Sequence, residues 1–166
     1  MAFVPTYTAE DDLLSFINLR NEHELIARVC LGCDDETGAI YSVFVALTVD
    51  FTNPKGREIS FGVIESLPDG EDNWCSDGLQ TKRFLTGEHR KAALSCICSV
   101  VQTMVEQDDD IESLYMMTVE TDLPPKALVK YDAICQAVGS MGFKAGRDSS
   151  FHGTNIWLMA RNRAES

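Results

Sequence analysis

Apolar and polar residues alternate along the chain between Glu24 and Phe51, and this alternation predicts a β-hairpin. The stretch reads ELIARVCLGC, then the turn DDETG, then AIYSVFVALTVDF. A period of two puts every second side chain on the same face of a strand. The apolar residues on that face of the second strand are Ala39, Tyr41, Val43, Val45, Leu47, Val49 and Phe51. The turn TNPKG then leads to a third strand, REISFGVI, so we expect a three-stranded meander.

Helical spacing of apolar residues marks two longer segments in the second half of the chain. The stretch from Phe84 to Gln107, FLTGEHRKAALSCICSVVQTMVEQ, reads as a short polar turn followed by a long apolar helix. A second helix is expected after Pro124 and Pro125, which suit a helix start, and before Gly142, which suits a left-handed cap. Its apolar stripe contains Leu128, Tyr131, Ile134, Cys135, Val138 and Met141. A short first helix is expected between Ala9 and Asn21.

The remaining segments complete a single α+β domain over residues 1–166. Ile111 to Glu120, IESLYMMTVE, and the final GTNIWLMAR read as strands. Glu65 to Gln80 is rich in Gly, Pro and acidic residues, so we expect a long polar loop there. The predicted architecture is a mixed, mainly antiparallel sheet of about six strands with two longer helices packed on it.

Composition narrows the classes of partner. The chain has 166 residues, 45% of them hydrophobic, and a formal net charge of -12. Binding to nucleic acid draws on Lys and Arg at the phosphates, so this charge argues against a direct nucleic-acid ligand. A strongly acidic protein can instead dock on basic protein surfaces, because its summed field accelerates their association. The alternative is that the charge serves solubility alone.

Neither a signal peptide nor a membrane segment is expected. The N-terminal MAFVPTYTAEDD lacks a basic region followed by an apolar one, and no apolar run approaches the ~20 residues that span a bilayer. We therefore expect a cytoplasmic protein with reduced cysteines. Cys30 and Cys33 form the one Cys-x-x-Cys, but a structural zinc needs two further ligands, and no His-x-x-x-His accompanies them. We expect no metal site and interpret the cysteines as small buried thiols.

The order of these elements resembles a known enzyme layout. A helix, an antiparallel meander, and then strand, helix and strand to the end are similar to the GNAT acyltransferases. The stretch from Leu85 to Lys144 also resembles small phage-encoded proteins of unassigned function, some of which look like divergent acyltransferases. That stretch carries LTGEHRKA, the apolar helix, IESLYMMTVE and ALVKYDAICQAVGSMGFKA. The resemblance implies a GNAT-like fold, but function must still be argued from the site.

The resemblance also implies a cofactor loop at the start of the long helix. In GNAT proteins a loop of the form Gln/Arg-x-x-Gly-x-Gly/Ala holds the pyrophosphate of acetyl-CoA on backbone N–H groups at the helix N-terminus. Here Arg83, Thr86, Gly87 and Arg90 are the candidate cofactor-binding residues. The pattern departs from the family, because the spacing is Arg-x-x-x-Gly and Glu88 or His89 replaces the second small residue.

The alternative for this turn needs no ligand. Thr86 would then be the N-cap, and the carboxylate of Glu88 would complement the helix dipole. A carboxylate at Glu88 would also repel a bound pyrophosphate by several kcal/mol at an effective dielectric constant of ~20. The cationic side chains of Arg83 and Arg90 would offset this repulsion.

Two residues are candidates for catalysis. Tyr131 is the candidate general acid, in the manner of acyltransferase tyrosines, and His89 lies at the expected cofactor mouth. The alternatives are a core tyrosine with a satisfied hydroxyl and a surface histidine.

Two functions follow from these residues. The first is a phage-encoded, acidic, GNAT-like protein, catalytically silent or divergent, that binds a host protein with a basic surface and needs no cofactor. The second is an active GNAT-like N-acyltransferase that uses acetyl-CoA. We expect the two to differ in whether the mouth from Arg83 to Arg90 binds a pyrophosphate.

Overall fold

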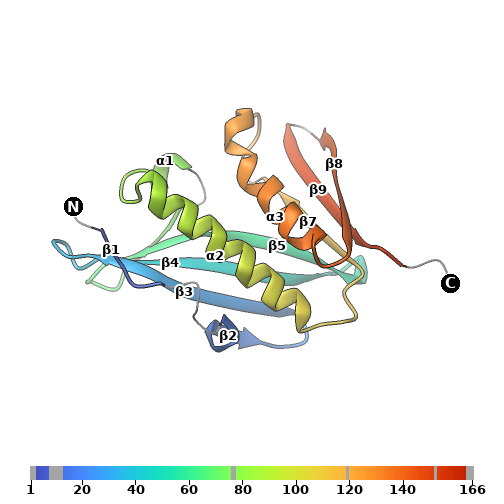
Figure 1. Ribbon diagram of the computed structural model, residues 1–166, viewed down its shortest axis with the longest axis horizontal. Coiled ribbons are helices and arrows are strands. Elements are labelled where there is room, and N and C mark those ends of the chain that lie inside the picture. Colours follow the sequence, from blue (N-terminus) through green and yellow to red (C-terminus); the bar gives the residue numbers. More distant parts are fainter. Residues whose placement is uncertain (1–2, 8–12, 76–77, 119, 152, 164–166) are drawn as a thin grey trace.

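The computed structural model describes residues 3–7, 13–75, 78–118, 120–151 and 153–163 (Figure 1). The strands are β1 Phe3–Pro5, β2 Ile17–Arg20, β3 Glu24–Asp34, β4 Ile40–Asp50, β5 Asn53–Ser66, β6 Asp72–Cys75, β7 Ser113–Met117, β8 Phe143–Phe151 and β9 Thr154–Arg161. The α-helices are α1 Gly78–Thr81, α2 Gly87–Glu106 and α3 Val129–Gly139, and the short 3₁₀ helices are η1 Leu13–Phe16 and η2 Pro125–Ala127.

All the described strands belong to one mixed sheet. The strand order is β1-β3-β4-β5-β7-β9-β8, with β2 added to β3 and β6 added to β5. The strands β3, β4 and β5 form the expected antiparallel meander. The pairing of β5 with β7 is parallel, since α2 carries the chain back before β7 begins. The antiparallel pair β8 and β9 completes the sheet.

Helices α2 and α3 lie across the same face of the sheet (Figure 1). They also contact each other, and Gln102 of α2 donates a hydrogen bond from Nε2 to the carbonyl oxygen of Ala137 at 2.8 Å. Helical spacing turns one stripe of α2 toward the sheet, as the pattern predicts. The buried residues of that stripe are Ala93, Cys96, Ile97, Val100, Val101, Met104 and Val105. The main core therefore lies between the sheet and these two helices.

The parallel pair β5 and β7 is short. It extends only from Gly56 opposite Ser113 to Glu58 opposite Tyr115. From Val63 onward, β5 pairs instead with the antiparallel strand β6. On the helix-covered side of this transition, three aromatic rings from different elements meet. Tyr131 of α3 stacks on Trp157 of β9 at 4.3 Å and contacts Phe61 of β5 at 5.2 Å.

No helix of the described residues covers the opposite face of the sheet. Side chains alternate along β4, so Phe44 points away from the face that buries Val43 and Val45. Phe44 contacts the ring of Trp74 from β6 edge-on at 4.8 Å. An antiparallel sheet can leave one face in water, and its residues then decide what that face contacts. We call this surface the uncovered face.

Within the described part of the chain, the sheet has nine strands, whereas about six were expected. Three of the additional strands are β1, β2 and β6, each three or four residues long and paired with a longer strand. Segments this short carry too few residues for a period of two to stand out, and their strand conformation comes from the partner strand. The polar loop expected from Glu65 to Gln80 therefore contains β6 and α1.

The expected first helix is also wrong. In its described part, only Leu13–Phe16 is helical, as the 3₁₀ turn η1, and Ile17–Arg20 is strand β2. Residues 9–12 of that expected helix lie outside the described residues. The apolar spacing that suggested a helix is met instead by packing of η1 against α2 and pairing of β2 with β3. Tertiary contacts override a weak local preference over so few residues.

Two single-residue expectations had opposite outcomes. Phe51 does not continue the apolar face of β4, because it lies in the turn before β5 and is 87% exposed. Gly142 has φ of +90°, in the left-handed region predicted for it. Among the described residues, no helix combines the length and apolar character that crossing a membrane requires.

Candidate functional site

The turn before α2 is held by two apolar side chains and leaves the first residues of the helix exposed. Phe84 and Leu85 are buried, whereas Thr86, Gly87 and Glu88 are exposed. Thr86 has the extended backbone of an N-cap, but its side chain makes no capping hydrogen bond. Among the described residues, the N–H groups of the first helical turn have no acceptor before that of Arg90, which donates to Thr86 O at 2.9 Å. The predicted capping by the Thr86 hydroxyl is therefore absent.

The candidate cofactor-binding cations lie around this helix start. Arg83 is exposed, and Arg90 is half-buried. The Nε atom of Arg90 is enclosed and has no hydrogen-bond partner in the described part of the chain. Open space surrounds the Cα of Gly87, since a Cβ added there would meet no atom within 4 Å. These features are compatible with an anion at the helix start, while the exposed carboxylate of Glu88 opposes one.

His89 turns away from this helix start and packs against β1. Its ring lies 4.6 Å from that of Phe3 and is tilted by 57°. A hollow of about 30 Å³ borders the pair and is otherwise apolar in its lining. The lining residues are Phe3, Pro5, Tyr7, Leu31, His89 and Ala92. In this position the imidazole helps hold a short edge strand.

Tyr131 is a buried aromatic residue at the start of α3. It is 8% exposed, stacked on Trp157 with ring planes 8° apart, and Lys130 Nζ lies 5.5 Å from its ring. Burial, and then the charge of Glu120, raises the pKa of the Tyr131 hydroxyl. No described residue forms a hydrogen bond with that hydroxyl. The ring of Tyr131 therefore belongs to the core.

The two predicted catalytic residues do not meet. His89 contacts β1, and Tyr131 contacts β5 and β9. The start of α2 nevertheless lies near the carboxyl end of β5, because Phe84 stacks on Tyr41, which pairs with Glu65 of β5, and α3 follows the strand β7 that is parallel to β5. In sheets with parallel strands, ligands bind outside these ends. The structure does not bring the two residues together.

A chain of aromatic contacts that the sequence did not reveal lies beneath the start of α2. Tyr41 of β4 stacks on Phe84 at 4.1 Å and lies 5.9 Å from Phe3. Its hydroxyl donates a hydrogen bond to Glu65 Oε2 at 3.1 Å. Burial and this hydrogen bond raise the pKa of Tyr41 well above its usual range. The aromatic chain fixes the turn before α2, which explains why Phe84 is buried.

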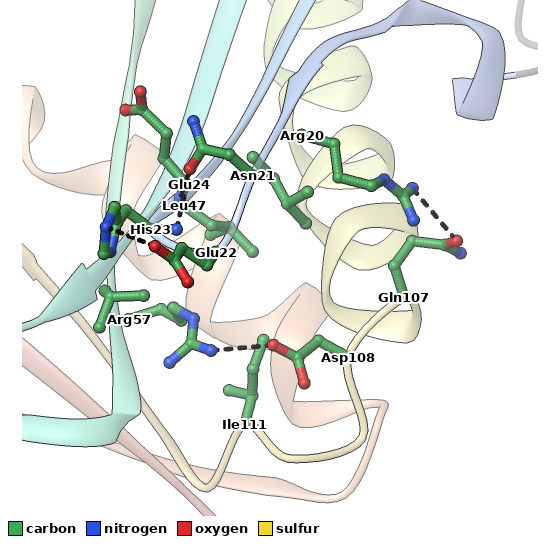
Figure 2. A pocket seen from close by; sticks show the side chains of 12 residues that line it. Arg20, Asn21, Glu22, His23, Glu24, Leu47, Arg57, Gln107, Asp108 and Ile111 are labelled. Carbon is green, nitrogen blue, oxygen red and sulfur yellow. Dashed lines mark hydrogen bonds and ion pairs between the residues drawn. The ribbon is translucent and has the colours of Figure 1, made fainter.

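A larger hollow lies at the opposite end of α2 (Figure 2). Its volume is about 220 Å³. The guanidinium of Arg57 points to Asp108 in this view, with Nη2 2.9 Å from Oδ2, and its Nη1 donates to the carbonyl oxygens of Pro54 and Gly56. Arg20 donates to Gln107 at 3.5 Å. The polar side chains that line the hollow form hydrogen bonds and an ion pair with one another and with nearby backbone carbonyl groups. We therefore interpret the hollow as structural.

Two acidic turns adjoin at the end of the sheet that lies near the start of α2. The turn after β3 and the turn after β5 touch, since a Cβ on Gly38 would lie 3.4 Å from Pro68 Cγ. Exposed carboxylates on these turns form what we call the acidic edge. It consists of Asp35, Glu36, Asp69 and Glu71. The buried Asp34 is not part of it, because its Oδ1 accepts the N–H groups of Glu36 and Thr37.

A further cluster of acidic residues lies at the opposite end of α2 from the acidic edge. Asp108, Asp109 and Asp110 follow the C-terminal end of α2, at the opposite end of that helix. Asp108 is paired with Arg57, and its Oδ1 also accepts the N–H of Asp110. The sequence treats the acidic clusters alike, but the fold separates this one from the acidic edge. Only Asp109 and Asp110 are exposed in it.

Trp74 lies next to the acidic edge on the uncovered face. It is 58% exposed, and β6 follows directly after the turn that carries Asp69 and Glu71. Beside it, Arg28 lies 3.6 Å from Asp72 and donates to Ser66 Oγ at 2.6 Å. The sequence placed Trp74 in a polar loop, and only its pairing with β5 fixes which face it occupies.

Metal and thiol chemistry find no support in the described residues. No group of His, Cys, Asp or Glu side chains there is placed to hold a metal ion. All six cysteines are free. The interpretation of every cysteine as a buried thiol is wrong for Cys30, which is exposed, and holds only in part for Cys33 and Cys98, which are half-buried. Burial does raise the pKa of Cys135, to about 11.

A scan against protein-family models finds no match, and a search of curated proteins finds no similar chain.

Proposed function

We propose that this chain is a phage-encoded, GNAT-like protein that is catalytically silent and docks on the basic surface of a host protein. The acidic edge carries this proposal. Four exposed carboxylates on two touching turns concentrate charge at one end of a molecule whose net charge is -12. A localised field of this kind steers a cationic partner and orients it during encounter.

The order of the elements supports a GNAT-like layout. An antiparallel meander, a long helix, a parallel strand, a second helix and a final antiparallel pair follow one another, as the resemblance implies. The starts of α2 and α3 lie at the carboxyl ends of β5 and β7. A fold alone does not supply chemistry, however, so activity must come from the groups at this edge.

Those groups favour a silent protein. A general acid must reach the reacting group, but the ring of Tyr131 is enclosed between Phe61 and Trp157. His89 is engaged with Phe3, and the hollow beside it has about 30 Å³. Pockets for small ligands have roughly 300–1,000 Å³. Among the described residues, the hollow that His89 lines is therefore too small for an acyl group and its acceptor, and the Tyr131 ring packs against other rings.

The acidic edge is tested by a pull-down from host lysate at low and high salt. The test variant is Asp35→Asn/Glu36→Gln/Asp69→Asn/Glu71→Gln, and the control is Asp109→Asn/Asp110→Asn at the far end of α2. We expect the partner to be retained by the native protein and the control at low salt, and lost from the test variant. High salt should release it, because exposed charges are screened beyond ~8 Å at physiological ionic strength. A partner set that is equal for both variants would refute docking through this edge.

Acetyl-CoA binding is the second candidate function, and the start of α2 favours it. The first-turn N–H groups are unengaged by described residues, and Arg90 Nε lacks an acceptor. The enzyme would catalyse direct attack of a substrate amine on the thioester. A ligand at ~100 times its Kd stabilises the native state by roughly 2.7 kcal/mol. Acetyl-CoA should then raise the Tm of the native protein but not that of Arg83→Glu/Arg90→Glu. The absence of any shift at millimolar acetyl-CoA would remove this candidate.

A further inference from the structure

We propose that Trp74, supported by Phe44, is the residue on which the basic partner docks, and that the partner places an Arg or Lys side chain over its indole ring. This inference rests on the proposed function and adds the contact residue and the chemistry of the partner. The partner is a polypeptide segment with clustered cationic side chains.

The position of Trp74 is unusual for a tryptophan that only stabilises the fold. The other tryptophan, Trp157, is 1% exposed, stacked on Tyr131 and hydrogen-bonded through Nε1 to Asp132 Oδ1 at 3.1 Å. Trp74 is 58% exposed on a four-residue strand, and its described ring contact is the edge of Phe44. Exposed aromatic residues of this kind are enriched among the residues that dominate binding energy in protein interfaces.

The uncovered face and the acidic edge form one continuous surface around Trp74. The turn that bears Asp69 and Glu71 leads within three residues to Trp74. Asp72 is paired with Arg28, and the exposed carboxylates of Asp69 and Glu71 lie three to five residues before Trp74 along the chain. An aromatic face attracts a cation through its quadrupole, and neighbouring carboxylates attract the same cation. Both features therefore select a cationic side chain.

Charge also decides between occupants of this surface. A second copy of the chain would carry the same net charge of -12 and the same acidic edge, so its approach is opposed. Nucleic acid is repelled for the same reason. A basic polypeptide brings the opposite charge and can supply apolar groups to Phe44 and to neighbouring Ile40, which is 45% exposed.

The test uses an octa-arginine peptide as the defined probe and calorimetric titration at low salt. Trp74→Ala should weaken binding about tenfold, since a partly desolvated cation–π contact contributes on that scale. Phe51→Ala is the matched control, because Phe51 is 87% exposed in the turn before β5, outside this surface. Its affinity for the probe should equal that of the native protein. Trp74→Tyr should recover most of the lost affinity, which loss of folding would not allow.

A second readout reports contact with the indole directly. In a Trp157→Phe background, Trp74 is the one remaining tryptophan of the chain. Its fluorescence should change on addition of octa-arginine and stay constant when octa-aspartate is added instead. A constant signal at saturating octa-arginine would overturn the contact.

The outcomes separate this inference from the proposed function. Equal affinities for Trp74→Ala and Phe51→Ala, with weaker binding by the acidic-edge variant, would overturn the role of Trp74 and leave docking intact. Equal affinities for the acidic-edge variant and Asp109→Asn/Asp110→Asn would overturn docking through that edge. Self-association of the native protein in sedimentation, lost in Trp74→Ala, would assign the face to a second copy and overturn the basic partner.

Discussion

The two faces of the sheet use the same type of residue for different purposes. On the helix-covered face, Trp157 is enclosed by α3 and makes a stacking contact and a hydrogen bond. On the uncovered face, Trp74 contacts Phe44 and is otherwise directed to solvent. Removing the Trp157 ring should destabilise the fold, whereas removing the Trp74 ring should leave stability nearly unchanged and weaken only the binding of a partner. The difference separates side chains that determine stability from those available for binding.

The same contrast divides the candidate residues at the starts of the helices. Tyr131 and His89 both turn toward the helix-covered side, where they pack against Phe61, Trp157 and Phe3. The exposed charges of the acidic edge belong to turns outside that core. The two candidate catalytic residues thus make packing contacts, while the acidic residues of two distant turns lie close together.

Replacement of the enclosed tryptophan should have the largest effect. Trp157→Ala removes a ring stacked at 4.3 Å and leaves a cavity under α3, so we expect a loss of about 3–5 kcal/mol in the free energy of unfolding. Urea denaturation followed by circular dichroism measures it. A loss below about 1 kcal/mol would show that the two faces do not differ in the way described.

A smaller loss of stability is expected from overpacking the contact between β1 and β3. A Cβ on Gly32 would lie 2.2 Å from the carbonyl oxygen of Val4 and 2.7 Å from Phe3 Cζ. Gly32→Ala should therefore displace β1 from β3 and cost about 1–3 kcal/mol, the scale of overpacking. Thermal melting measures the cost, and Gly146→Ala on β8, where a Cβ meets nothing within 4 Å, is the control. Equal Tm values for the two variants would contradict this account of β1.

Replacement on the uncovered face should leave stability nearly unchanged. Trp74→Ala removes a ring that is 58% exposed, so we expect a change within about 0.5 kcal/mol, as for surface substitutions. Urea denaturation followed by circular dichroism measures this change, and Trp157→Ala is the variant for comparison. A loss comparable to that of Trp157→Ala would mean that Trp74 holds β6 in the sheet and is not free to bind.

The rates at which Cys135 and Cys30 react with a thiol reagent compare a buried site with an exposed one, and no substitution is needed. Burial raises the pKa of Cys135 from 9.0 to about 11, so its reactive thiolate is scarce near neutral pH. Cys30 is exposed on β3. Iodoacetamide should label Cys30 first, as read by peptide mass spectrometry. Because the raised pKa belongs to the folded state, this thiol stabilises the fold below pH 9 and ceases to do so as the pH rises through about 11. Labelling of Cys135 as fast as Cys30 at neutral pH would contradict its burial.

Segments with a strong period were predicted correctly from sequence. The strands β3, β4 and β5, the helices α2 and α3, and the strand β9 all lie where the spacing of apolar residues placed them. The misses have identifiable causes. Strand β8, FKAGRDSSF, carries Gly, Ser and Asp in place of alternating apolar residues, and its conformation comes from pairing with β9. Strand β2 shares the apolar spacing that favours a helix and becomes a strand through β3.

The candidate site was located only in part. Its position at the start of α2 and the cations beside it follow from local sequence, since Arg83 through Arg90 are consecutive in the chain. The packing of His89 on Phe3 and of Tyr131 on Trp157 joins residues far apart in the chain, and no local pattern encodes it. The same holds for the acidic edge, which exists because Gly38 and Pro68 touch.

By itself, the sequence determined the net charge, the type of the long elements and the apolar stripe of each long helix, because each of these depends on composition or on spacing within one segment. The tertiary structure decided which strands are neighbours, which face the helices cover and which acidic turns meet. These depend on contacts between distant segments, and the side of the sheet that a residue occupies is set by the register with its partner strand. Trp74 is exposed beside the acidic edge because β6 pairs Trp74 with Ile64 of β5, a relation that a short polar segment does not reveal.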